Sequence, residues 1–265
     1  MVIAAAAIVP SVRAQKPEPL TIGETFTLPS ATLKETRRIN VYLPSAYTET
    51  ATTRLPVLYM PDGGMAEDFL HIAGLVQVLT GNGTMRPFIL VGIENTERRR
   101  DMTGPTEDPE DKKIAPRVGG SQAFRAFIRT ELMPAIRERY RTTDETAIVG
   151  ESLAGLFVVE TFLREPDLFN TYIAFDPSLW WNKEALVKSA PDALKASRER
   201  KRAMYLSSSN QPELAAVTAR FAALLNAEGG AQLSWTHVPM PAEQHSTIYH
   251  PAALAAFRAV FKPAK

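Results

Sequence analysis

Strand-like apolar runs alternate with helix-like amphipathic segments from Leu55 to the end of the chain. This alternation is typical of a mostly parallel sheet that is covered by helices on both faces. Two earlier runs, 24–28 and 38–43, alternate with period two and predict an antiparallel N-terminal edge. Later strands are predicted over 57–60, 88–93, 147–149, 172–175, 204–206 and 233–238, and the clearest helices over 121–140, 214–226 and 252–261.

The chain has 265 residues, of which 45% are hydrophobic, and this is enough for one sizeable core. We therefore predict a single α/β domain over 21–265, after an export segment and leader over 1–20. The only long connection predicted is the polar stretch 96–119, and loops of this length are often functional.

The first residues resemble a secretory signal. Val2–Val9 is apolar and alanine-rich, and Val12-Arg13-Ala14 before Gln15 is similar to a cleavage site with small residues. The stretch is short and lacks a basic start, so a truncated signal, a weak anchor and a frayed terminus all stay open. We expect export to the periplasm or the exterior, with a cytoplasmic location as the alternative.

Composition removes several functional classes. The formal net charge is +1 without basic or acidic blocks, so no nucleic acid or anionic membrane is expected as a partner. The absence of cysteine excludes a thiol nucleophile and thiolate metal sites. No metal-ligand cluster or phosphate loop is present, so no metal and no cofactor are expected. No apolar run reaches the roughly 18 residues of a membrane span. A small-molecule ester is the expected partner, and the oligomeric state is not predicted.

Gly150-Glu151-Ser152-Leu153-Ala154-Gly155 lies between an apolar strand-like run and a helix-forming run. A serine on a sharp turn between strand and helix has the context of a nucleophile elbow, whose strained backbone requires small flanking residues. Gly150 and Ala154 are small. Ala154 stands where glycine is usual, and the alternative is an ordinary turn with Ser152 as helix N-cap.

A serine nucleophile needs a histidine base on a loop that can reach it. His245 follows the last predicted strand and precedes the last helix, which is the place of the base in an α/β hydrolase. His71 and His237 fall inside a predicted helix and a predicted strand, and His250 opens the terminal helix. We therefore predict His245 as the base.

The acid that orients the histidine should follow the strand over 204–206. Glu213 is the acid that follows this strand, although a glutamate in the first turn of a helix also suits the helix dipole. Asp176, at the end of the preceding strand, is the alternative. We predict Glu213 ahead of Asp176.

Two backbone N–H groups should stabilise the developing oxyanion. Leu153 follows the serine and supplies one. The glycine-rich turn after the first parallel strand should supply the other. We predict Gly64 as this donor, with Gly63 and Met65 as the neighbours that could replace it.

Three further residues are candidates for substrate binding. Trp180 and Trp181 follow a predicted strand end, where aromatic side chains line a pocket or complete the core. Arg100 lies in a short basic run of the long loop, and would bind an anionic or catecholate group if that loop folded over the site.

Several motifs together resemble the putative-esterase family of α/β hydrolases, which is related to esterase D and to esterases that open siderophore lactones. They are 38–44 (RINVYLP), 59–64 (YMPDGG), 92–95 (GIEN), 100–103 (RDMT), 150–155 (GESLAG) and 176–181 (DPSLWW). The resemblance covers nearly the whole chain after about residue 20. It implies an α/β-hydrolase fold and a serine carboxylesterase with Ser152 and His245 in the active site and the Asp-Gly-Gly loop as oxyanion donor. Ala154, Pro61 and Gln211 depart from the family pattern, and Gln211 puts the acid in doubt.

Two functional classes remain. One is an active serine esterase, whose substrates range from simple acyl esters to siderophore lactones, or an acyltransferase that uses the same acyl-enzyme. The other is a non-catalytic binding module on the same fold. A serine, a histidine and a candidate acid in chain order favour the enzyme.

Overall fold

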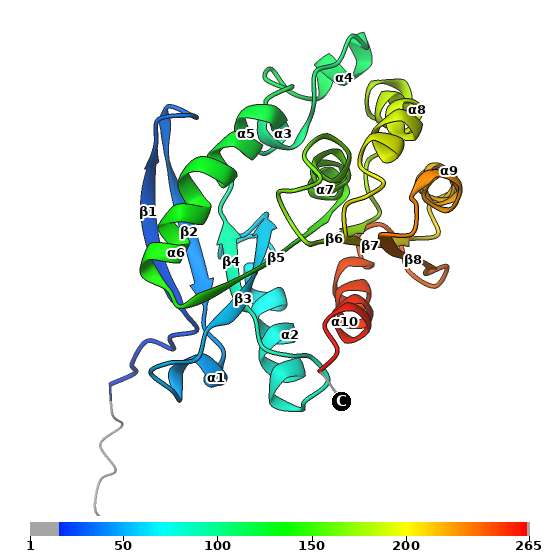
Figure 1. Ribbon diagram of the computed structural model, residues 1–265. Coiled ribbons are helices and arrows are strands. Elements are labelled where there is room, and N and C mark those ends of the chain that lie inside the picture. Colours follow the sequence, from blue (N-terminus) through cyan, green and yellow to red (C-terminus); the bar gives the residue numbers. More distant parts are fainter. Residues whose placement is uncertain (1–15, 264–265) are drawn as a thin grey trace, which may run out of the picture.

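The computed structural model describes residues 16–263, which are built around an eight-stranded sheet (Figure 1). The strand order is β1-β2-β4-β3-β5-β6-β7-β8, where β2 pairs antiparallel with β1 and β4 and the remaining pairs are parallel. The strands are β1 (Glu24–Ser30), β2 (Glu35–Tyr42), β3 (Leu55–Pro61), β4 (Ile89–Ile93), β5 (Thr142–Glu151), β6 (Thr171–Phe175), β7 (Arg202–Ser208) and β8 (Leu233–Pro239). The predicted α/β-hydrolase fold, with its antiparallel N-terminal edge, is confirmed.

Helices cover both faces of the sheet (Figure 1). One face packs against α2 (Phe69–Gly81) and α10 (Tyr249–Val260). The other packs against α5 (Ser121–Phe127), η1 (Ile128–Leu132), α6 (Met133–Arg139), α7 (Ser152–Arg164), α8 (Trp181–Ala196) and α9 (Pro212–Glu228). A short helix α1 (Ser45–Thr48) joins β2 to β3. Because successive side chains of a strand point to opposite faces, the central strands are apolar on both sides.

The helix predicted over 121–140 is interrupted by a π-helical turn, η1. Met133 N–H donates to the carbonyl of Ile128, five residues earlier. Pro134 follows at the start of α6 and has no N–H to donate, and its ring would clash with the carbonyl four residues before it. The wider turn relieves this conflict without ending the helix.

The connection 96–119 also contains structure that the sequence did not reveal, namely α3 (Arg98–Met102) and α4 (Pro109–Ile114). The buried carboxylate of Asp101 accepts hydrogen bonds from Arg37 on β2 and from Arg100. Arg37 and Asp101 are both fully buried. This ion pair holds α3 against the antiparallel edge of the sheet.

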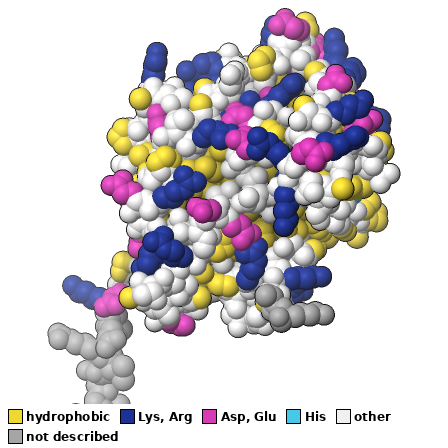
Figure 2. All heavy atoms as spheres, viewed as in Figure 1, with side chains coloured by type: hydrophobic (Ala, Val, Ile, Leu, Met, Phe, Trp, Pro, Cys, Tyr) yellow, Lys and Arg dark blue, Asp and Glu magenta, His cyan; other side chains and the backbone are white. Residues whose placement is uncertain are grey.

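Basic and acidic side chains are interspersed on the face that Figure 2 shows. No helix within residues 16–263 is long and apolar enough to cross a bilayer. The signal-like residues 1–15 lie outside the described residues. The division into an export segment with leader and one domain therefore stays a prediction.

Candidate active site

Ser152 sits between β5 and α7 with a left-handed backbone, φ 58°. A non-glycine residue rarely adopts this conformation, and a sharp elbow requires it. A Cβ added to Gly150 would lie 2.8 Å from the Cβ of Ala154. The same Cβ would lie 2.7 Å from the backbone carbonyl of Ala154, so the close approach of the chain at residue 154 requires glycine at position 150.

His245 lies on the loop between β8 and α10 and reaches Ser152. Its Nε2 is 3.1 Å from Ser152 Oγ, a hydrogen-bond distance. The ring is half-buried. A hydrogen bond to Asp176 raises the pKa of His245, and burial opposes that rise.

Asp176 completes the hydrogen-bonded chain. Its Oδ2 is 2.9 Å from His245 Nδ1, and its Oδ1 accepts from the backbone N–H of Ser209 over 2.8 Å. Burial of this fully covered carboxyl would raise its pKa, but the hydrogen bonds from His245 and Ser209 outweigh it and hold the pKa of Asp176 below its usual value. An ionised Asp176 fixes the Nδ1–H tautomer and leaves Nε2 free to accept from the serine.

The structure thus corrects the ranking of the two candidate acids. Glu213 is exposed in the first turn of α9, whereas Asp176 bonds to His245. The end of β7 and the residue after it still contribute: Ser207 C=O in β7 accepts from Asp176 N–H, and Ser209 N–H donates to the carboxylate. The carboxylate that contacts His245 therefore lies one strand earlier than the predicted one, and it is held from the strand where the acid was expected.

A second carboxylate borders the imidazole. Glu151, next to the nucleophile, has Oε1 at 3.3 Å from His245 Nδ1. Burial raises the pKa of Glu151 to about 8. Sequence reasoning gave Glu151 no role, although it stands within the elbow motif.

The predicted oxyanion loop approaches the sheet closely. A Cβ at Gly63 would lie 2.2 Å from the backbone N of Ile93, so only glycine fits there. Gly64 N–H donates to Glu67 Oε2 over 2.6 Å, and Glu67 N–H donates to Gly64 C=O over 3.0 Å. These two hydrogen bonds close a tight turn over residues 64–67, one through the backbone and one through the Glu67 side chain. The predicted donor at Gly64 is therefore occupied by a carboxylate in this structure. Leu153 N–H belongs to the first turn of α7, where amides lack intrahelical acceptors.

Ion pairs fix the base of this loop. Arg98 on α3 donates to both carboxylate oxygens of Asp62, over 2.6 and 2.8 Å. Asn95 Nδ2 bridges Asp62 and Glu67, over 2.6 and 2.9 Å. Asp62 has φ 56°, so the pair holds a strained residue in place.

The three predicted binding residues lie in different environments. Trp181 is buried, and its Nε1 donates to Gly104 C=O over 2.9 Å, so it belongs to the core. Trp180 is 38% exposed. Ser178, two residues before it, has its Oγ 3.5 Å from Ser152 Oγ. Of the two tryptophans, Trp180 is therefore the one exposed to solvent.

Arg100 is engaged inside the protein rather than at a binding surface. Its guanidinium pairs with Glu35 over 2.8 Å and with Asp101 over 2.7 Å. The hydrogen bond to Glu35 is the main cause of a raised Arg100 pKa. The guanidinium of Arg100 is therefore already paired with carboxylates of the protein, and the structure does not present it for the predicted binding of an anion.

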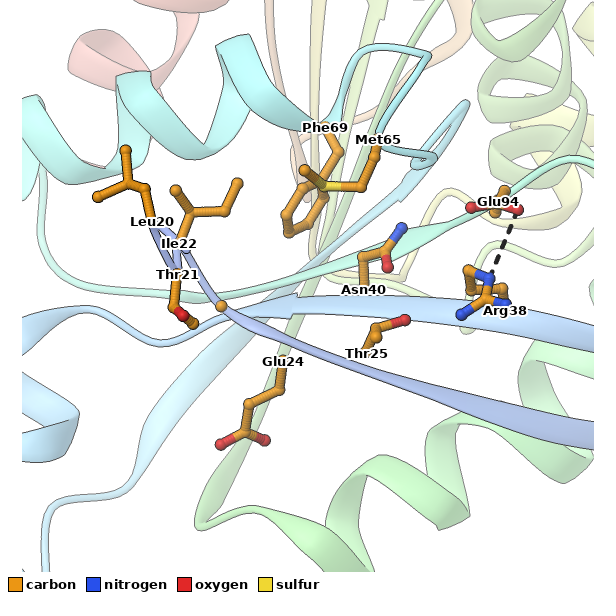
Figure 3. Close-up of a pocket in the computed structure, with 11 residues that line it drawn as sticks. Leu20, Thr21, Ile22, Glu24, Thr25, Arg38, Asn40, Met65, Phe69 and Glu94 are labelled. Atoms are coloured by element: carbon orange, nitrogen blue, oxygen red, sulfur yellow. Dashed lines mark ion pairs between the residues drawn. The ribbon is translucent and has the colours of Figure 1, made fainter. Parts of the chain in front are cut away.

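A cavity of about 480 Å³ lies between the N-terminal segment, β2 and the start of α2 (Figure 3). Met65 and Phe69 line one side, and Leu20 and Ile22 the other. Its lining does not include Ser152, so we do not assign it to the reacting ester.

Three comparisons bear on this site. A model of the putative esterase family matches residues 30–250. The ferri-bacillibactin esterase BesA of Bacillus subtilis (strain 168) is 33% identical over 189 residues, covering 63% of this chain and 64% of the relative. The siderophore triacetylfusarinine C esterase of Aspergillus fumigatus is 29% identical over 187 residues, covering 66% of this chain and 62% of the relative. This chain thus spans less than two thirds of the length of both curated relatives. An IroE-like serine hydrolase from Shewanella oneidensis superposes with a TM-score of 0.81 at 28% identity, covering 90% of this chain and 80% of that one.

Proposed function

We propose that this chain, which belongs to the putative esterase family, hydrolyses carboxylic ester bonds through an acyl-enzyme on Ser152. The observation that carries the proposal is the continuous hydrogen-bonded chain from Ser152 Oγ through His245 to Asp176. Aligned in this way at a strained elbow, the three groups have the geometry of a catalytic triad. A binding module would have no need of it.

The mechanism follows from the geometry. Ser152 Oγ attacks the ester carbonyl carbon while its proton passes to His245 Nε2, and the imidazolium is stabilised by Asp176. Leu153 N–H supports the oxyanion, and Gly64 N–H joins it once Glu67 turns away. The imidazolium then protonates the leaving alcohol, and the acyl-enzyme remains. Water, deprotonated by His245, releases the acid by the reverse sequence.

The names of the two curated relatives suggest which esters to try first. Both are called esterases of siderophores, so siderophore-type esters and lactones stand beside simple acyl esters as proposed substrates. The exposed Trp180 offers a flat apolar contact for such a substrate. Transfer of the acyl group to an alcohol other than water would use the same site. Export of the protein also remains a proposal.

The test compares the parent chain with Ser152→Ala. The parent should label covalently with a fluorophosphonate probe and hydrolyse p-nitrophenyl butyrate, and the variant should do neither while keeping its melting temperature. A siderophore-ester panel then ranks substrates. Turnover by Ser152→Ala close to that of the parent would refute the nucleophile assignment.

A further inference from the structure

His245 Nδ1 faces two carboxylates from different elements. Asp176 Oδ2, after β6, is 2.9 Å away, and Glu151 Oε1, at the end of β5, is 3.3 Å away. A Ser-His-acid triad needs one such acceptor. The second requires an explanation, because burying a carboxyl group without a hydrogen bond is unfavourable.

Other uses of Glu151 do not account for its position. Glu151 is the N-cap of α7, but its side chain makes no capping hydrogen bond. Arg98, a charged neighbour, already pairs with Asp62 through two hydrogen bonds. Within residues 16–263, Glu151 Oε1 is buried and accepts no well-aligned hydrogen bond. The cationic group next to it is the imidazole of His245, when that ring is protonated.

We propose that Glu151 is a second acceptor for His245, a positioning residue that shares the imidazolium with Asp176 and replaces it in part when Asp176 is lost. The inference rests on the proposed esterase function. Above the pKa of His245 the imidazolium forms only while the ester reacts, so an acceptor at 3.3 Å in the resting state becomes attractive when the ring gains its charge. No bond to Glu151 forms or breaks.

The ionised form of Glu151 is the stronger acceptor for Nδ1–H, while the neutral acid accepts more weakly through its carbonyl oxygen. Burial raises its pKa to about 8, with the charges of Asp176 and Asp62 adding to the rise, while His245 and Arg98 act in the opposite direction. Tyr249 on α10 also faces this group, and its buried hydroxyl has no partner within the described residues. Glu151 is therefore mostly neutral at pH 7 and ionised at pH 9. Removing the Asp176 charge should lower this transition to somewhat below pH 8.

The test measures kcat/KM against pH from 6 to 10 for Glu151→Gln, Asp176→Asn and the double variant. We expect losses of about fivefold, about a hundredfold and about ten-thousandfold, the last being the loss in a triad without its acid. The loss expected for the double variant exceeds the product of the two single losses, because in each single variant the remaining carboxylate still accepts from His245. The activity of Asp176→Asn should also rise through a second ionisation just below pH 8, and the double variant should lack this rise.

Glu213→Gln is the matched control, since it makes the same change on the exposed start of α9 and should leave the rate unchanged. A double variant no slower than Asp176→Asn would overturn the inference, as would a pH profile of Asp176→Asn that is unaltered by Glu151→Gln. Equal melting temperatures separate a loss of positioning from a loss of folding. Fluorophosphonate labelling of Ser152 in the parent chain tests the proposed function separately.

Discussion

Removing the Glu67 side chain should speed ester hydrolysis, because it frees a donor that the oxyanion needs. Gly64 N–H now donates to Glu67 Oε2 over 2.6 Å, and a substrate must displace this carboxylate. A hydrogen bond to a charged group contributes about 1.5–3 kcal/mol net. Since Glu67 is partly exposed and water offers its carboxylate an alternative partner, we take the lower limit. About 1.4 kcal/mol is tenfold in rate, so Glu67→Ala should raise kcat/KM about tenfold.

The assay is kcat/KM on p-nitrophenyl butyrate for a graded series at position 67. Glu67→Gln keeps a neutral acceptor, roughly half as strong as a charged one, and should give about a threefold rise. Asp68→Ala is the control, because it removes the same charge one residue later from a carboxylate that contacts His71 instead.

The same substitution should destabilise the fold slightly. Glu67 Oε1 accepts from Asn95 Nδ2 over 2.9 Å, and this bond is lost together with the one from Gly64 N–H to Glu67 Oε2. About 1 kcal/mol corresponds to a melting temperature lower by roughly 2–4 °C. A fall in kcat/KM for Glu67→Ala, with Asp68→Ala unchanged, would refute the reasoning. It would mean that Glu67 shapes the loop and that the donor is Met65 N–H.

Three further outcomes are expected. Because the neutral ring is the base and Asp176 raises the pKa of His245, kcat/KM should rise with pH through a value above 6.5. The stability that this pair contributes is present below about pH 6.5 and should fall as the pH rises through the same interval. A kcat/KM that does not change with pH would exclude His245 as the base. Trp180→Ala should raise KM several-fold for aryl esters with kcat nearly kept, and an equal effect on methyl esters would contradict the proposed contact. Asp101→Ala leaves the buried Arg37 with Glu35 as its remaining carboxylate partner, so calorimetry should show melting lower by a few degrees, from a cost below the roughly 3–5 kcal/mol of a fully unpaired buried charge; an unchanged transition would show that the pair is dispensable.

The sheet could be predicted because its strands have local signatures. The central strands are continuous apolar runs, and those of the antiparallel edge alternate with period two. The short helices of the stretch 96–119 carry no such pattern. Helix α3 is held by the buried pair of Arg37 and Asp101, and Asp111 of α4 accepts from Thr106 and Asn182. The π-helical turn could not be predicted either, because the sequence does not show whether Pro134 lies at the start of a helix or inside one.

The site was predictable where backbone geometry fixes it. Ser152 and His245 each follow a strand, and the order of the strands in the sheet decides where the two residues lie. The structure brings their side chains within hydrogen-bond distance. The sequence ranked Glu213 ahead of Asp176, whereas Asp176 contacts His245 in the structure, because chain order does not determine which of two neighbouring strand ends carries the carboxylate. The occupied Gly64 N–H was also beyond prediction, because only atomic positions show where the Glu67 side chain turns.

The support of Asp176 by the backbone of the loop after β7 has a consequence for evolution and for engineering. Ser209 N–H donates to Asp176, and the Ser209 side chain also helps to lower the Asp176 pKa. Proline at position 209 would therefore remove the amide contact, and alanine would remove the hydroxyl. A library in this loop should therefore keep serine at position 209 and vary exposed positions such as Gln211, whose side chains do not contact Asp176. The same neighbourhood gives a short mutational route by which the acid could migrate between β6 and β7, with both carboxylates present in the intermediate sequence.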